Sequence, residues 1–385
     1  MEDFNTNSSI VDYDLYGIVG IRLINPGERD IKNLSKLYAN FRSELRREPD
    51  ITIHYKENWQ IGDIFYLGLD EAGFNDDGFY ILSSGRSPLK IKIPFEQIGN
   101  KCELVCEQGI GGIPLLNHII NLTFLKKKYL PIHASAFLYN NVGALVIGWS
   151  KGGKSEALFS FIKNGAKFVG DETVIISPDG KKMFGIPVPV SIWEWQFSEI
   201  QELMPPLSNQ KKILFKGIHF IEWVHRVSSK SILKNNSIIK MMGDALPALR
   251  RQLNIRIGPE VIFDGKVQWE MVNLDKIILA MSHSKNEISV KECSENKIAS
   301  RMINSNLHEL DSFYNYYSTF KFAFPGLSNN FLERVPEIYN NLLSKALSGI
   351  ESYKVLHPYP VSFEKLYRAM EPIFQTRKNS TNKKE

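Results

Sequence analysis

Residues Gly148 to Ser155 read G-W-S-K-G-G-K-S and follow the spacing G-x-x-x-x-G-K-S. Glycines let backbone N–H groups turn inward toward phosphate oxygens, in conformations that side chains would block. A lysine and a hydroxyl at the end of such a loop reach the β- and γ-phosphates and Mg²⁺. The spacing therefore predicts a nucleotide loop in which Lys154 contacts phosphate and Ser155 holds Mg²⁺.

The flanking segments are the ones that such a loop needs. Residues 143–148 form a short, continuously apolar run, which is typical of a strand buried on both faces. Residues 154–164 have a helical pattern, and Gly165 follows as a helix stop. The positive end of the helix dipole would favour phosphate. We assign nucleotide contacts to the following residues: Gly148, Trp149, Ser150, Lys151, Gly152, Gly153, Lys154, Ser155 and Glu156.

Three further side chains could do chemistry beside this loop. The predicted helix leads away from the glycine loop, and the strand after it leads back. This path returns Asp171 and Glu172 to the strand ends where the phosphates would lie. A carboxylate there can bind Mg²⁺ or accept the proton of an attacking hydroxyl. His133 lies two short strands before the loop. Each alone is more often structural, but their spacing around the loop predicts that all three belong to one site.

The elements that must position these residues fall into two units. A chain of 385 residues, 43% hydrophobic and 23% charged, has the composition of an ordinary globular protein. Its length favours two domains over one. We expect a smaller α+β N-terminal domain at 1–125, with strands at 13–24 and 79–84 and helices at 30–45 and 113–129. The nucleotide-binding domain would cover 126–376, with a disordered tail at 377–385.

Composition excludes several classes of protein. A net charge of +5 over 385 residues lacks the dense basic stripe of a nucleic-acid-binding protein. Three cysteines argue against a secreted disulfide scaffold. The acidic, polar start M-E-D-F-N-T-N-S-S is unlike a secretory signal, and no apolar run has the length of a membrane span. We therefore expect a cytoplasmic protein with neither nucleic acid nor membrane as partner; its oligomeric state stays open.

Residues 132–176, I-H-A-S-A-F-L-Y-N-N-V-G-A-L-V-I-G-W-S-K-G-G-K-S-E-A-L-F-S-F-I-K-N-G-A-K-F-V-G-D-E-T-V-I-I, resemble the core of the HPr kinase/phosphorylase family and its relatives, the HPr-kinase-like serine kinases. The resemblance implies a mixed α/β fold, in which a P-loop kinase domain like that of phosphoenolpyruvate carboxykinase follows the smaller N-terminal domain. It also implies transfer of the γ-phosphate of ATP to a hydroxyl, usually a serine of a protein, a peptide or free serine, with Mg²⁺ present.

The resemblance implies a role for each candidate. Asp171 matches the first acid of the family's acidic pair and would be the general base. Glu172 matches the second and would assist with the metal. His133 matches the family's strand histidine, which lies near the transferring phosphate. Glu194, in S-I-W-E-W, is the candidate for the family's later metal-binding glutamate. Lys154 keeps its phosphate role as a catalytic residue.

Two departures leave alternatives to this kinase hypothesis. Lys151 stands where the family usually has glycine, and Glu172 stands where it has a second aspartate. A nucleotide-binding regulatory protein without transferase activity would tolerate both. A second alternative is a peptide-tailoring kinase of a natural-product pathway, in which residues 1–125 would bind a precursor peptide. A GTPase is disfavoured because the sequence has no N-K-x-D guanine motif. In the main hypothesis, residues 1–125 select the hydroxyl-bearing acceptor.

Overall fold

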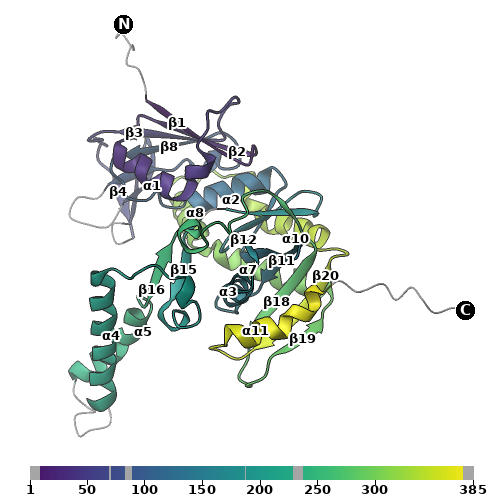
Figure 1. The fold of residues 1–385 in the computed structure, drawn as a ribbon. Coiled ribbons are helices and arrows are strands. Elements are labelled where there is room, and N and C mark those ends of the chain that lie inside the picture. The colour runs from purple at the N-terminus through teal and green to yellow at the C-terminus, as the bar shows by residue number, and fades with distance from the viewer. Residues whose placement is uncertain (1–8, 69–70, 83–88, 187, 229–236, 376–385) are drawn as a thin grey trace, which may run out of the picture.

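The computed structural model describes residues 9–68, 71–82, 89–186, 188–228 and 237–375. Within these residues the chain forms four β-sheets surrounded by helices, so the predicted mixed α/β class is confirmed (Figure 1). No helix in the described ranges combines the length and apolar character that a membrane crossing requires.

The N-terminal part of the chain builds an eight-stranded sheet in the order β1-β2-β3-β8-β7-β6-β5-β4. The strand expected at 13–24 is a hairpin, because Tyr16 and Gly17 have φ values of 58° and 70° and turn the chain between β1 and β2. The helix expected at 30–45 is shorter and begins earlier. The bounds are β1 Ile10–Leu15, β2 Val19–Ile24, α1 Glu28–Tyr38, β3 Ile51–Lys56, β4 Phe65–Leu67, β5 Ala72–Asn75, β6 Gly78–Leu82, β7 Lys90–Lys92, β8 Cys102–Glu107 and α2 Leu116–Lys126.

A helix from much later in the sequence covers part of this sheet. In α8 (Asp311–Ala323), the ring of Phe320 lies 6.0 Å from that of Phe79 and 5.3 Å from that of Phe95. The side-chain amide of Asn329, beyond the same helix, donates to the carbonyls of Phe95 and Ile98 at 2.8 Å each. Burial of these aromatic rings is a large apolar contribution to stability. The N-terminal sheet therefore completes its core with residues of the C-terminal half.

The second sheet has six strands in the order β12-β10-β11-β18-β20-β19. The pairs β11–β18 and β18–β20 are parallel, whereas β10 is antiparallel to both β11 and β12. The carboxyl ends of β11, β12, β18 and β20 and the amino end of β10 therefore lie along one edge. The bounds are β10 Ala134–Tyr139, β11 Val142–Ile147, β12 Lys167–Gly170, β18 Lys276–Ser282, β19 Ser289–Glu292 and β20 Glu351–His357.

Strand β11 is buried on both faces, as its apolar sequence predicts. Ala144 and Val146 belong to a cluster that includes α3 (Lys154–Lys163) and α11 (Phe363–Met370). Leu145 and Ile147 belong to a second cluster, which includes α7 (Glu295–Glu309) and α10 (Val335–Ala346). Alternation of side chains along a strand explains why neighbours enter different cores. The strand that carries the glycine loop is thus held from both sides.

Two smaller sheets and a helical arm complete the fold. The four-stranded sheet runs β17-β14-β13-β9, and β15 pairs with β16 alone. Helices α4 and α5 project away from the sheets (Figure 1), and α5 contains Pro247 within its length. The bounds are β9 Leu130–Ile132, β13 Val174–Ile176, β14 Lys182–Gly185, β15 Val190–Trp193, α4 Asn209–Ser228, α5 Ser237–Arg250, β16 Asn254–Ile257, α6 Pro259–Ile262, β17 Val272–Asn273 and α9 Asn330–Glu333.

Candidate active site

The glycine loop leaves the carboxyl end of β11 and enters α3 directly. Gly153, immediately before the helix, has a left-handed φ of 103°, and Lys151 has a φ of 60°. His357 closes the loop from the end of β20, where its buried ring places Nε2 3.0 Å from the carbonyl oxygen of Gly152. A Cβ atom on Gly153 would lie 1.9 Å from the same Nε2. Position 153 is therefore restricted to glycine by both conformation and space.

Substitution Gly153→Ala is expected to displace the loop, lower stability by about 2 kcal/mol or more and weaken nucleotide binding. Gly165→Ala is the matched control: Gly165 follows the same helix with a φ of 93°, but an added Cβ there would meet no atom within 4 Å. Thermal denaturation and ATP titration of both variants separate backbone strain from the clash with His357. Equal effects of the two substitutions would contradict the assignment of His357 as the closing residue.

The two functional side chains at the start of α3 are already engaged. Lys154 is buried, and its Nζ donates to the carbonyls of Gly148 at 3.2 Å and Trp149 at 3.0 Å. Burial lowers the pKa of Lys154, and the nearby carboxylates of Glu172 and Asp171 oppose that shift. Ser155 Oγ lies 3.1 and 3.2 Å from the two oxygens of Asp171 and donates to that carboxylate. Lys154 Nζ and Ser155 Oγ therefore lie at the edge of the sheet where β11 ends.

Asp171 directly follows β12 and reaches the same edge. Its carboxylate also accepts a hydrogen bond from Ser135 Oγ at 2.5 Å, near the amino end of β10. Burial raises the pKa of Asp171 to about 7, and the negative charge of Glu172 adds to the shift. A carboxyl group with a pKa near neutrality can take up and release a proton under working conditions. The structure thus brings Asp171 and Ser155 together, as the sequence predicted.

The raised pKa of Asp171 links stability to pH. Its folded pKa of about 7 exceeds the ordinary 3.8, so the stabilising contribution of this group is complete below the lower value and is lost as pH rises to the higher one. We expect the Tm of Asp171→Asn minus that of the wild type to increase from about pH 4 to about pH 7 and then level off. Thermal denaturation followed by circular dichroism at several pH values measures this difference. A difference independent of pH would contradict the raised pKa.

His133 occupies the turn between β9 and β10, and two glutamates face its ring. Its Nδ1 lies 3.6 Å from Glu172 Oε2, and its Nε2 lies 3.6 Å from Glu309 Oε1. Burial and, to a smaller extent, the positive charge of Lys154 together lower the pKa of His133 to about 3. The imidazole is therefore neutral near pH 7, and these contacts are not ion pairs. Glu309, the last residue of α7, has no signal in the sequence near the loop.

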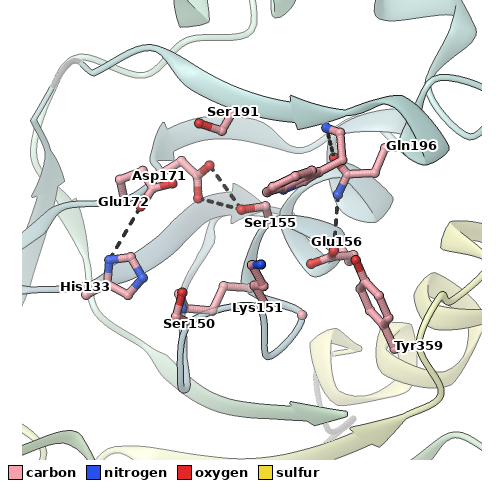
Figure 2. Close-up of a pocket in the computed structure, with 13 residues that line it drawn as sticks. His133, Ser150, Lys151, Ser155, Glu156, Asp171, Glu172, Ser191, Gln196 and Tyr359 are labelled. Atoms are coloured by element: carbon pink, nitrogen blue, oxygen red, sulfur yellow. Dashed lines mark hydrogen bonds and ion pairs between the residues drawn. The ribbon is translucent and has the colours of Figure 1, made fainter. Parts of the chain in front are cut away.

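These residues line a cleft of about 150 Å³ (Figure 2). The loop and the start of α3 form one wall, and the turn after β12 forms another. The lining residues are His133, Ser150, Lys151, Gly153, Lys154, Ser155, Glu156, Asp171, Glu172, Ser191, Trp193, Gln196 and Tyr359. The cleft therefore joins most of the residues that the sequence assigned to phosphate and proton chemistry.

Other residues to which the sequence assigned nucleotide contacts lie outside the cleft lining or are already hydrogen-bonded to the protein. Trp149 is 53% exposed and stacks on His308 with ring centroids 4.9 Å apart, outside the cleft lining. Gly148 and Gly152 are also absent from the lining; their role is to shape the turn. Glu156 is buried and accepts a hydrogen bond from Gln196 Nε2 at 3.1 Å, so one of its oxygens is already engaged at the cleft wall.

Glu194 is not brought to the cleft. Its Oε2 lies 2.7 Å from His219 Nε2 on α4, while Trp193 and Gln196 on either side line the cleft instead. Among the described residues, no cluster of three or more His, Cys, Asp or Glu side chains is arranged to hold a metal ion. Sequence reasoning also missed Gln196 and Tyr359, which come from segments with no recognisable motif.

No protein-family model matches this chain, and the curated proteins contain no match to it either. The chemistry of the cleft therefore has to be inferred from its own residues and their arrangement.

Proposed function

We propose that this chain is an ATP- and Mg²⁺-dependent kinase that transfers the γ-phosphate to a hydroxyl, most simply that of a serine in a protein, a peptide or the free amino acid. The observation that carries the proposal is the hydrogen bond between Ser155, at the end of the glycine loop, and the buried Asp171 at the same sheet edge. With the resemblance of residues 132–176, it favours the HPr-kinase-like group and the phosphoenolpyruvate carboxykinase-like P-loop fold for 126–376.

The loop suits a polyphosphate. α3 begins immediately after Gly153 and has no side-chain cap at that end, so the first N–H groups of the helix and its positive dipole end are available to an anion. Lys154 Nζ now donates to two loop carbonyls, and phosphate oxygens are stronger acceptors for an ammonium group. The β- and γ-phosphates would therefore displace these internal bonds and draw Lys154 toward them.

Ser155 and Glu172 fit a magnesium ion as oxygen ligands. In nucleotide sites Mg²⁺ uses one or two protein carboxylates together with substrate phosphates and water. A site without a complete cluster of protein ligands agrees with this pattern. The hydroxyl of Ser155 and the carboxylate of Glu172, which both line the cleft, would hold the ion, and Asp171 keeps its role as the general base. When bound, Mg²⁺ offsets the negative charge of the phosphate oxygens.

Asp171 is the group placed to activate the acceptor. Its carboxylate would take the proton of the acceptor hydroxyl as the hydroxyl oxygen forms its bond to the γ-phosphorus. The bond from that phosphorus to the β,γ-bridging oxygen breaks, and ADP leaves with the electron pair. Lys154 would stabilise the charge that develops on the phosphoryl oxygens. The neutral ring of His133 would adjoin the transferring group and adds no charge to it.

The test is nucleotide binding and label transfer by the purified protein. We expect Mg²⁺-dependent binding of ATP in preference to GTP, and movement of γ-phosphate label to an acceptor in a pool of free serine and serine-containing peptides. Binding of ATP with release of label to water alone would replace the kinase by the regulatory nucleotide-binding alternative. Absence of nucleotide binding would overturn the assignment of residues 148–155.

A further inference from the structure

A second pocket, of about 150 Å³, adjoins the nucleotide cleft. His133 and Glu172 line both cavities, so these two side chains form the wall between them. Most of the other lining residues come from α2, from β9, from the C-terminal part of α7 and from α10. They include His118, Asn306 and Glu309. A ligand in this pocket would have the turn of His133 as its only barrier from the phosphate site at that wall.

Two residues that line this pocket, Asn306 and His118, each have a buried side-chain atom without a hydrogen-bond partner. Asn306 is 3% exposed, and its Oδ1 accepts from the backbone N–H of His133 at 3.2 Å. That bond fixes the orientation of the amide and leaves Nδ2 as an unused donor. Buried donors without partners are rare and call for an explanation. A ligand atom that accepts a hydrogen bond would provide one here.

The second atom is Nδ1 of His118 on α2. Its Nε2 lies 3.2 Å from the backbone carbonyl of Glu309, and a carbonyl can only accept, so Nε2 carries the hydrogen. Burial lowers the pKa of His118, which keeps the ring neutral. Nδ1 is then a lone pair without a donor. The pocket therefore offers one unused donor, on Asn306, and one unused acceptor, on His118.

The charge of the pocket is negative. Glu172 and Glu309 line it, and none of its described lining residues is lysine or arginine. Burial raises the pKa of Glu309, and the charge of Lys154, which lines the neighbouring cleft, opposes that shift. Carboxylates in a partly enclosed site attract an ammonium group and repel an anionic ligand. A ligand should therefore bring a positive charge as well as an amide-like pair of hydrogen-bonding groups.

We propose that this pocket binds the phosphate acceptor and selects an amino-terminal seryl amide unit, either a small serine amide or the first residue of a peptide. The ammonium group would face Glu309 and Glu172, the carbonyl oxygen would accept from Asn306 Nδ2, and the amide N–H would donate to His118 Nδ1. The hydroxyl would then pass His133 toward Asp171. This inference rests on the proposed kinase function for the transfer step, but not for binding.

The test is calorimetric binding without nucleotide, using serinamide, free serine, N-acetylserinamide and the amide of Ser-Gly-Gly. We expect serinamide to bind at least about tenfold more tightly than free serine, whose carboxylate meets the acidic wall, and than N-acetylserinamide, which lacks the charge. Glu309→Gln should weaken serinamide binding at least about tenfold, since it keeps the side-chain shape and removes the charge that attracts the ammonium group. Glu295→Gln, on the same helix, is the control and should bind like the wild type.

ATP binding and label transfer, measured in parallel, separate the two proposals. If serinamide binds with the expected preference but ATP does not bind, the kinase function fails and the pocket assignment stands. If label moves from ATP but free serine binds as tightly as serinamide, or Glu309→Gln leaves serinamide affinity unchanged, the pocket assignment is overturned and the kinase function stands. Tighter binding of the Ser-Gly-Gly amide than of serinamide would identify the amino terminus of a peptide, rather than a small serine amide, as the ligand.

Discussion

Replacing Lys154 with alanine is expected to lower the rate of phosphoryl transfer by about 10³-fold, the upper range for loss of one electrostatic donor in an enclosed site. Lys154 is the lysine of the glycine loop whose ammonium group is buried in the cleft wall. Lys151 also lines the cleft, but its Nζ lies 5.2 Å from the centre of the Trp193 ring. Lys151 is therefore a second cation of the cleft, positioned against the Trp193 ring. Single-turnover transfer from labelled ATP measures the effect.

Lys163→Ala is the matched control, because Lys163 lies in the last turn of the same helix and donates to the carbonyl of Glu199, away from the cleft. It should retain wild-type transfer and wild-type ATP affinity. If Lys154→Ala transferred phosphate as fast as the control, the loop would not act on the transferring group, and the kinase assignment of the cleft would fail.

Asp171→Asn is expected to reduce transfer by about 10²–10⁴-fold while ATP still binds, because general-base catalysis contributes about that factor. Asparagine keeps the shape of the side chain, and its oxygen can still accept a hydrogen bond from Ser155 or Ser135. It cannot take the proton of the acceptor. The expected pattern is therefore a loss of turnover without a matching loss of nucleotide affinity, measured by label transfer and by ATP titration.

The control for this variant is Asp179→Asn, in an exposed turn where the carboxylate interacts with Ser177. Wild-type turnover in Asp179→Asn excludes a general effect of removing one negative charge. A fully active Asp171→Asn protein would assign the proton transfer to another group, and Glu172, which shares the cleft, would then be the next residue to replace.

Much of the glycine-loop side of the site could be predicted because its signals are local. The apolar strand, the glycine loop and the following helix occupy consecutive residues, and hydrogen bonding within each element fixes their geometry. The return of Asp171 to the same edge followed from one helix and one strand. The structure adds that β12 runs in the same direction as β11, which places their carboxyl ends together.

The other parts of the site depend on contacts between segments that are distant in the sequence, and local sequence patterns do not predict such contacts. His357 closes the loop only because β20 pairs in parallel with β18, and β18 with β11. Glu309 and Asn306 face His133 because α7 packs beside it. Glu194 had a suitable residue type, but the 3-10 turn that it begins directs it to His219. The tight hairpin at Tyr16 and Gly17 was hidden within an apolar run.

The cover that α8 provides for the N-terminal sheet bears on how this gene can change over evolution. A recombination event that exchanged residues 1–125 alone would leave Phe320 facing a foreign sheet in place of Phe79 and Phe95. The amide of Asn329 would also lose the carbonyls of Phe95 and Ile98. Such a chimera would carry exposed aromatic surface and unpaired buried groups, both of which destabilise a fold. We therefore expect residues 1–125 to be replaceable without loss of stability only if α8 and Asn329 change with them.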